Sequence, residues 1–356
     1  MLCHKTQIST NNADVQTSNI PNIHISQTGV EKLLSPLKPH KAAGSDNITP
    51  FVLKELAGVI APILTYIFQK SLDTGVVPQD WRDANITPIF KKGSRFVASN
   101  YRPVSLTCIC SKLMEHIVVS NMMTHLESTG SLSERQHGFR AKRSCETQLV
   151  DFVHQLTSHL EQGQQVDAVI MDFSKAFDKV AHNRLLYKLD RMGIRGEAQE
   201  WVKQFLSGRR QRVVVEGVSS ETAPVTSGVP QGSVLRPILF LIYINDLPDA
   251  VSSEVRMFAD DTIIYRHITT KADFDILQDD LRKLELWERE WQMEFHPGKC
   301  NVMSITNKRK PVVHSYVLHR QALTPVTDAK YLGVTLCSDL KWNNHITEVA
   351  AKLTRP

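Results

Sequence analysis

Two adjacent carboxylates, Asp260 and Asp261, lie between the apolar runs 255–258 and 262–265. The pattern predicts a strand, a tight turn that carries both acids, and a second strand. Like charges this close repel each other, and burial disfavours the charged form of each. A bound divalent cation removes that conflict, and Mg²⁺ prefers hard oxygen ligands of this kind. A solvated turn is the alternative, and the apolar residues on both flanks weigh against it.

A third acid, Asp172, lies near the end of the apolar run 166–173, which predicts a buried strand. Three carboxylates from two neighbouring strands can hold two metal ions about 3.5–4 Å apart, the arrangement that serves in-line phosphoryl transfer. Successive strand residues point to opposite faces of a sheet. We therefore expect one of Asp260 and Asp261 to bind metal more directly than the other.

The elements that must position these acids mix helices and strands without a regular βαβ order, which favours an α+β fold. Apolar periodicity predicts helices near 27–37, 49–74, 110–126, 144–161, 182–192, 197–207, 234–247 and 273–294. Strands are expected at 84–90, 100–106, 166–173, 212–216, 223–225, 255–258, 262–265, 302–305, 312–318 and 331–336. Residues 1–30, rich in Ser, Thr, Asn and Gln near their start, are interpreted as a loose lead-in.

The composition sets further bounds. The 42 basic and 37 acidic side chains give a net charge of +5, a mild excess that is compatible with a polyanionic partner. The six cysteines include no CxxC pair, which argues against a zinc site and predicts free thiols in a reducing compartment. The longest apolar run, 238–244, is far shorter than a membrane span. No signal peptide is apparent, so we expect an intracellular protein without membrane association.

Four motifs occur in a fixed order along the chain: DFSKAFD at 172–178, SGVPQGS at 227–233, NDLP at 245–248 and FADD at 258–261. Together they resemble the palm motifs of non-LTR retrotransposon reverse transcriptases, nearest to the jockey-like elements. The resemblance covers residues from about 33 to 336. It implies a right-hand polymerase fold with an antiparallel sheet backed by helices. The expected parts are fingers at 31–165, a palm at 166–335 and a truncated thumb at 336–356.

The resemblance also implies a role for each matching residue. Asp172, Asp260 and Asp261 match the catalytic metal ligands, which hold two Mg²⁺ ions with Mn²⁺ as a possible substitute. Phe177 matches the ring that excludes a 2′-OH, with an ordinary core phenylalanine as the alternative. The further expected positions are Lys91, Lys92 and Arg102 near the triphosphate, Gln231 and Gly232 near the base pair, Lys299 as general acid, and Tyr331, Leu332 and Gly333 at the primer end. For Lys299 an exposed loop lysine is the alternative, and for Arg102 a surface salt bridge.

The expected activity is RNA-directed DNA polymerase, with an RNA template, a DNA primer and dNTPs as partners, in the cytoplasm and nucleus. The parent element is expected to supply an endonuclease that is absent here. Two positions depart from the family pattern: Arg236, where Gly is usual, and His296, where Asn is common. A catalytically silent nucleic-acid-binding remnant is therefore the first alternative. A nucleotide-sugar transferase with a paired-acid site is the second, and a purely structural domain is the third.

Overall fold

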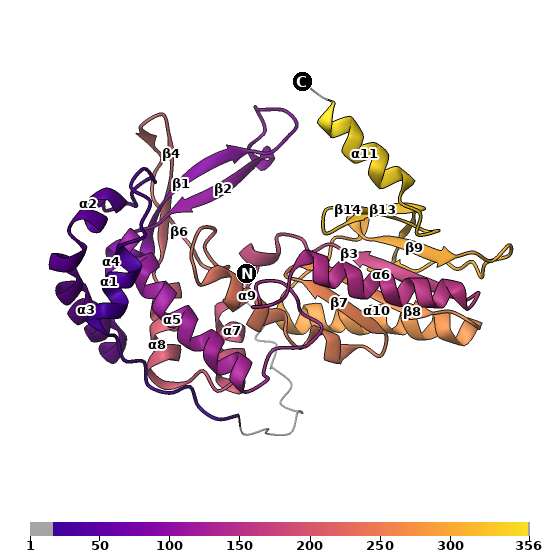
Figure 1. Ribbon diagram of the computed structural model, residues 1–356, viewed down its shortest axis with the longest axis horizontal. Helices are drawn as coiled ribbons and strands as arrows, with labels where there is room; N and C mark the ends of the chain where they lie inside the picture. Colours follow the sequence, from indigo (N-terminus) through magenta and orange to yellow (C-terminus); the bar gives the residue numbers. More distant parts are fainter. Residues whose placement is uncertain (1–16, 355–356) are drawn as a thin grey trace. The chain divides into compact units, whose positions relative to one another are not determined.

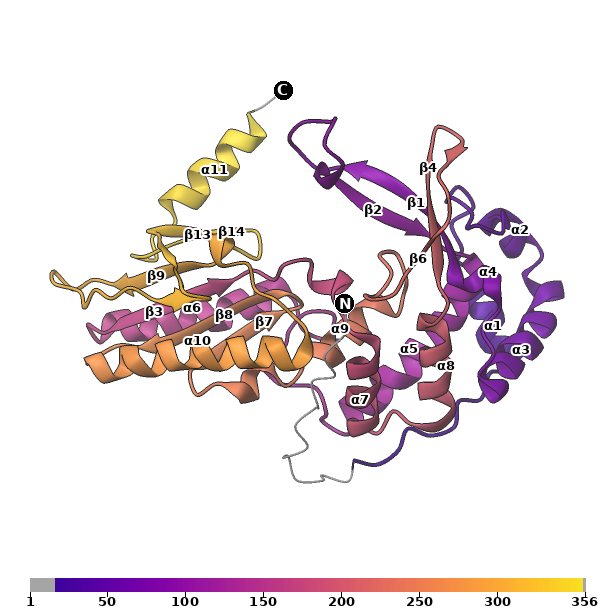
Figure 2. The same ribbon diagram turned by 180° about the vertical axis from the view of Figure 1, so that it is seen from behind.

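The computed structural model describes residues 17–354, and two compact units divide them (Figure 1, Figure 2). The first, which we call the sheet unit, comprises residues 132–176 and 244–354. The second, the helical unit, comprises residues 17–131 and 177–243. Both units are built from discontinuous stretches, whereas the predicted fingers, palm and thumb are continuous. Those predicted boundaries remain a prediction, and each unit is described by itself.

A five-stranded sheet with the order β12-β9-β3-β8-β7 forms the centre of the sheet unit. Its pairs are antiparallel except β12 with β9. The strands are β3 (Gln165–Met171), β7 (Glu254–Phe258), β8 (Asp261–His267), β9 (Asn301–Thr306) and β12 (Thr324–Pro325). Helix α6 (Cys145–Glu161) packs Phe152 and Leu156 against alternate residues of β3, β8 and β9. This alternation follows from the two-residue period of a strand and produces the buried core.

The sheet unit contains further elements outside that sheet. Helix α10 (Lys271–Trp291) contacts β8 and buries Leu277, Leu281 and Leu284. The others are η3 (Leu247–Ala250), η4 (Pro297–Lys299), β10 (Val317–Leu318), β11 (Gln321–Ala322), β13 (Asp328–Tyr331), β14 (Val334–Cys337) and α11 (Asn343–Leu353). The truncation of a thumb around α11 remains a prediction.

The helical unit contains a mixed sheet with the order β2-β1-β4-β5, and β6 pairs with β4. Strands β1 (Asp83–Phe90) and β2 (Tyr101–Leu106) form a long antiparallel hairpin, and β1 runs parallel to β4 (Arg210–Val215) (Figure 1). The short strands are β5 (Val218–Ser219) and β6 (Ala223–Pro224). The helices are α1 (Gln27–Leu34), α2 (Pro50–Glu55), α3 (Ala57–Thr74), α4 (Gln79–Arg82), α5 (Ile109–Ser128), α7 (His182–Arg191), α8 (Gly196–Leu206) and α9 (Arg236–Ile244). The 3₁₀ turn η1 (Ala98–Asn100) lies between β1 and β2 in the chain, and η2 (Ala176–Asp178) begins at the last residue of the 132–176 stretch.

Several predicted elements differ from the structure. The predicted strand 331–336 is a hairpin, because Leu332 and Gly333 adopt positive φ angles of 48° and 86° and reverse the chain. The predicted helix 49–74 breaks at Leu56, whose ψ is 15°. The predicted helix 234–247 ends at Ile244, and only Val317–Leu318 of the predicted strand 312–318 is paired.

Three further features of the sequence can be compared with the structure. The five cysteines within residues 17–354 are free thiols, as predicted, and Cys3 lies outside the described residues. Residues 17–26 precede the first helix without forming a regular element, and residues 1–16 of the predicted lead-in lie outside the described range. Residues 27–30 of that prediction are wrong, because they form the first turn of α1. Among the described helices, none combines the length and the apolar character that crossing a membrane requires.

Candidate functional site

The register of the central strands brings the three acids to one end of the sheet. Met171, the last residue of β3, pairs with Thr262 of β8, and β7 pairs with β8 as far as Phe258 with Asp261. Continuing the antiparallel register by one residue places Asp172 beside Asp261. Asp260 occupies the turn between β7 and β8, next to Ala259, whose φ is 54°. The predicted strand–turn–strand is therefore present, with β8 beginning at Asp261.

The electrostatics of this turn reflect the crowding of like charges. Burial by surrounding atoms, and then the negative charges of Asp260 and Asp172, raise the pKa of Asp261 to about 6. By accessible area Asp261 is an exposed residue, so solvent screens part of this effect. The repulsion among the carboxylates does not depend on that burial, because it requires only that they are close. The structure thus brings together the three acids that the sequence placed far apart.

The chemistry of these donors fits a divalent cation. Carboxylate oxygens are the hard ligands that Mg²⁺ prefers, and a dication relieves the repulsion that raises the pKa of Asp261. Within residues 17–354, no three His, Cys, Asp or Glu side chains already form a metal-ligating cluster. The three acids are therefore close enough to repel one another, but their side chains are not arranged as a closed ligand set.

Lys299 lies beside the first of these acids. Its Nζ is 3.7 Å from Oδ1 of Asp172, and the two side chains are 57% and 46% exposed. The backbone N–H of His296 donates to the Asp172 carbonyl at 2.8 Å, and the Phe173 and Phe295 rings stack at 4.2 Å. These contacts attach the segment before Lys299 to the end of β3. The ammonium group is consequently held near the acids while it stays accessible to a ligand.

Gln136 supports the acidic turn in a way that the sequence did not predict. Its Oε1 accepts hydrogen bonds from the backbone N–H groups of Ala259 at 2.9 Å and Gly138 at 2.8 Å. A Cβ on Gly138 would lie 2.4 Å from the Ala259 nitrogen, so only glycine permits this approach. In the sequence, QHGFR at 136–140 also resembles a family segment, and this resemblance predicts that the segment packs near the template. The position of Gln136 in this motif was the only signal of a role.

Replacing Gln136 with alanine is expected to lower the free energy of unfolding by about 1–3 kcal/mol, because the buried Ala259 N–H loses its acceptor. Urea denaturation measures this loss. Gln162→Ala, at the C-cap of α6, is the matched control and should change stability by less than about 0.5 kcal/mol. Equal effects of the two substitutions would show that the turn does not depend on Gln136.

The predicted primer-end residues lie on the β13–β14 hairpin. Tyr331 is buried, its hydroxyl accepts a hydrogen bond from Gln148 Nε2 of α6, and its ring lies 5.9 Å from that of Phe152. Burial raises the pKa of the Tyr331 hydroxyl. Leu332 is partly buried and Gly333 is exposed. Tyr331 therefore fixes the hairpin in the core, and the turn residues are the part of it that solvent reaches.

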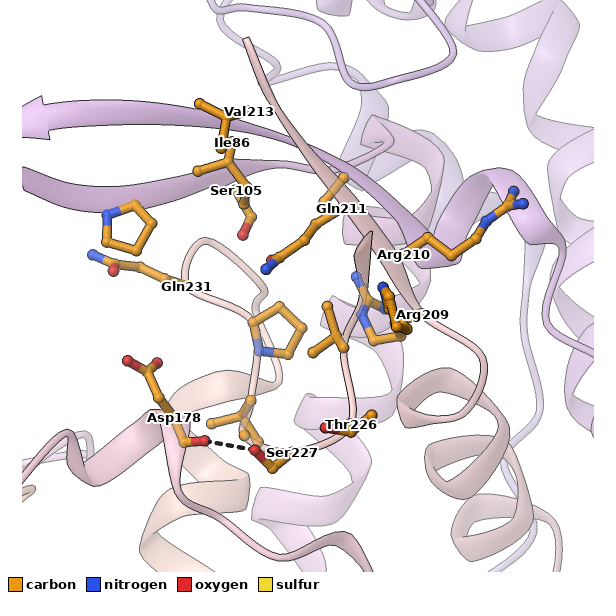
Figure 3. Close-up of a pocket in the computed structure, with 17 residues that line it drawn as sticks. Ile86, Ser105, Asp178, Arg209, Arg210, Gln211, Val213, Thr226, Ser227 and Gln231 are labelled. Atoms are coloured by element: carbon orange, nitrogen blue, oxygen red, sulfur yellow. Dashed lines mark hydrogen bonds between the residues drawn. The ribbon is translucent and has the colours of Figure 1, made fainter. Parts of the chain in front are cut away.

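In the helical unit, the 227–233 loop is bonded to the segment that begins at Phe177. The Val229 N–H donates to the Phe177 carbonyl at 2.9 Å, and the Gly228 N–H donates to the Val180 carbonyl at 2.8 Å. The Ser227 hydroxyl donates to the Asp178 carbonyl at 3.1 Å (Figure 3). The structure thus joins two motifs that are about fifty residues apart in the sequence.

The same loop also contacts β2. The Ser105 N–H donates to the Gln231 carbonyl at 2.8 Å, and Gly232 has a φ of 111°. A Cβ on Gly232 would lie 2.5 Å from the Ser105 carbonyl oxygen, which explains the glycine. Gln231 lines a cavity of about 430 Å³, toward which Gln211 of β4 also extends (Figure 3).

The three predicted cations lie on the β1–β2 hairpin and are exposed. The Lys91 N–H donates to the Asn100 carbonyl at 2.9 Å, and Arg102 is paired with Ile89. The cavity lining within the described residues includes Gln231 but not Lys91, Lys92, Arg102 or Phe177. The structure therefore connects Phe177, Gln231 and Gly232 through one loop, and it places the cations on a separate element.

Glu115 of α5 is a second residue that the sequence did not single out. It is fully buried, and its carboxylate accepts hydrogen bonds from the Ser233 hydroxyl and from the backbone N–H groups of Val234 at 2.7 Å and Leu235 at 3.1 Å. These groups precede α9. The available signal was a lone acid on the apolar stripe that Val118 and Met122 continue.

Comparison with known proteins identifies what this chain is similar to. Residues 89–336 match the family model described as reverse transcriptase (RNA-dependent DNA polymerase). The chain is 30% identical over 346 residues to the RNA-directed DNA polymerase from mobile element jockey of Drosophila melanogaster, covering 93% of this chain and 37% of that protein. The corresponding protein of Drosophila funebris is 30% identical over 330 residues, covering 90% and 36%. The chain thus spans a little over a third of these relatives' length.

Proposed function

Because the chain belongs to the reverse transcriptase family, on its non-LTR retrotransposon branch, we propose that it extends a primer 3′-OH with deoxynucleotides, directed mainly by an RNA template. The family match implies the polymerase fold of fingers and palm, in keeping with the mixed helices and sheets. The observation that carries the proposal is the approach of Asp172 to the Asp260–Asp261 turn. An RNA-directed DNA polymerase needs such a group of acids.

In the proposed reaction, the primer 3′-oxygen attacks the α-phosphorus of the dNTP. A phosphorus–oxygen bond forms there, and the bond to pyrophosphate breaks. Asp172, Asp260 and Asp261 would hold two Mg²⁺ ions, or Mn²⁺ in their place. When bound, these ions would lower the pKa of the 3′-OH and neutralise charge on the phosphates. Lys299, whose Nζ is 3.7 Å from Oδ1 of Asp172, would donate a proton to the leaving pyrophosphate.

The other predicted residues have proposed roles within the same reaction. Phe177 lies under the nucleotide sugar and excludes a 2′-OH, while Gln231 and Gly232 support the base pair between template and nucleotide. Lys91, Lys92 and Arg102 neutralise triphosphate charge. Leu332 and Gly333 contact the primer end, and Tyr331 holds their hairpin in place.

The proposed partners are an RNA template and a DNA primer, bound mainly through their phosphates, so that binding weakens as salt concentration rises. Chromosomal DNA nicked by an endonuclease of the parent element would supply the primer. We propose that the protein acts in the cytoplasm and the nucleus.

Magnesium binding can be tested without turnover. We expect Mg²⁺ to raise the melting temperature of the metal-free chain by about 2–4 °C, because a ligand that binds only the folded state stabilises it. Asp261→Asn should abolish this rise, whereas Asp275→Asn, an exposed acid of α10, should retain it. Differential scanning fluorimetry across a magnesium titration measures both. An equal rise in all three proteins would place the ion elsewhere.

Primer extension by the purified chain, with Mg²⁺, dNTPs and an RNA template, tests the function itself. The proposal expects products whose sequence follows the template. Salt-sensitive binding of the primer–template without extension would instead support a catalytically silent remnant. If the chain neither binds nor extends the primer–template, the result would contradict both the polymerase proposal and the silent-remnant alternative.

A further inference from the structure

Arg236 contacts Val229, Phe177 and Asp178 inside the helical unit. Its Nη1 donates a hydrogen bond to the Val229 carbonyl at 2.8 Å. Its Cζ lies 4.3 Å from the centroid of the Phe177 ring, and its Nη2 is 3.9 Å from Oδ1 of Asp178. The Arg236 side chain is only 16% exposed. An arginine held by a carbonyl, a ring and a carboxylate is a fixed part of the structure, in contrast to a solvated surface cation.

The Phe177 ring is held from two positions on the same helix. Arg236 and Phe240 are four residues apart on α9, so their side chains lie on one face. The Phe240 ring stacks on that of Phe177 with a centroid distance of 4.1 Å and an interplanar angle of 29°. A guanidinium over an aromatic ring adds an electrostatic attraction to this packing. Phe177 is therefore restrained by a second group besides its apolar neighbour.

Val229 links Arg236 to the backbone of Phe177. Its N–H donates to the Phe177 carbonyl at 2.9 Å, and its own carbonyl accepts from Arg236. Arg236 consequently connects the Phe177 side chain to the loop residue that binds the Phe177 backbone. A shift of the ring would disturb both the cation–ring contact and this loop.

The backbone at this position does not require glycine. Arg236 is the first residue of α9, and a helical conformation is open to any L-residue. Glycine, which is usual here in the resembling family, has no side chain with which to make these three contacts. Arg236 therefore adds a restraint on Phe177 without adding backbone strain.

We propose that Arg236 is a positioning residue that fixes the Phe177 ring and so sets how strongly the site discriminates against the 2′-OH of a ribonucleotide. The inference rests on the proposed function, because it takes Phe177 as the ring under the nucleotide sugar. A ring excludes one additional oxygen only if it cannot tilt away. The restraint from α9 limits that movement, since closely packed groups move little without losing contacts.

The test compares dCTP with CTP incorporation opposite template G. Arg236→Gly should lower the ratio of the two kcat/KM values by about threefold to thirtyfold, the range that a cation–ring contact supplies. Arg236→Lys should fall between this variant and the native chain, because lysine keeps the charge but not the planar group. A general structural defect would slow both substrates and leave the ratio unchanged. Arg195→Gln, a solvent-accessible arginine paired with Asp190, is the matched control and should keep the native ratio.

A double-mutant cycle with Phe177→Val separates the inference from its alternatives. Once the ring is removed, Arg236→Gly should not change the ratio further, whereas independent effects of the two substitutions would overturn the inference. The same four proteins in urea denaturation report the Arg236–Phe177 coupling without turnover. Zero coupling there would overturn the inference even if no nucleotide is incorporated. Absent incorporation with clear coupling would instead count against the proposed function and support the positioning role.

Discussion

Replacing Asp260 and Asp261 together with asparagine is expected to reduce dNTP incorporation by at least about a thousandfold. Asparagine keeps the size of each side chain but removes the negative charge that would hold the metal ions. The loss should appear even in the rate at saturating dNTP, because the ions that acidify the 3′-OH would no longer be held. Single-turnover primer extension with excess enzyme measures that rate.

The same double variant should fold as well as the native chain, which separates a catalytic defect from a folding defect. The raised pKa of Asp261 means that its charged form is less favourable in the folded state. The resulting loss of folding stability grows as the pH rises from the ordinary pKa range of a carboxyl group to about 6, and it is fully present at pH values above 6. Without metal at pH 7.5, the variant should therefore be as stable as the native chain or about 1 kcal/mol more stable, after allowance for solvent screening.

Asp275→Asn, on the exposed side of α10, is the control for loss of an acid and should keep native incorporation. Template-directed incorporation that persists at a tenth or more of the native rate in the double variant would exclude these acids as the catalytic centre. A variant that is inactive and also unfolded at 25 °C would contradict the stability expectation.

The acidic centre was predictable because its signals are local. Two acids between apolar runs predict a turn, and an acid at the end of a third apolar run predicts a neighbouring strand. The pairing of Met171 with Thr262 then follows from the register that buries alternate residues such as Ala168 and Ile263 in the core. The motif order added the family, although the roles of these residues remain a proposal.

The supporting residues were not predictable in the same way, because their partners are distant in sequence. Gln136 accepts from Ala259 across 123 residues, and Glu115 accepts from Leu235 across 120. Neither pair has a local pattern that indicates the contact. The Leu332–Gly333 turn was missed for another reason: the run 331–336 is apolar enough to read as one strand, and only the positive φ angles reveal the reversal.

Glu115→Leu is expected to lower the free energy of unfolding by about 3–5 kcal/mol. Leucine approximates the volume but accepts no hydrogen bond, so the Val234 N–H and the Ser233 hydroxyl lose their acceptor inside the protein. The carboxylate also faces the N-terminal end of α9, where a negative charge is favourable. Urea denaturation measures the global loss, and faster amide hydrogen exchange in α9 should locate it.

Two further variants decide whether the cost arises from these hydrogen bonds. Glu115→Gln retains one oxygen acceptor without the charge, so it should cost about 1–2 kcal/mol and lie between leucine and the native chain. Glu55→Ala removes an exposed acid from α2 of the same unit and should cost less than about 0.5 kcal/mol. If Glu115→Leu left the denaturation midpoint and the α9 exchange rates unchanged, the start of α9 would be held by its apolar packing alone. Because the Ser233–Leu235 segment directly follows Gly232, faster exchange that extends from α9 into residues 228–232 would also mean that a residue of α5 determines how firmly the proposed nucleotide loop is held.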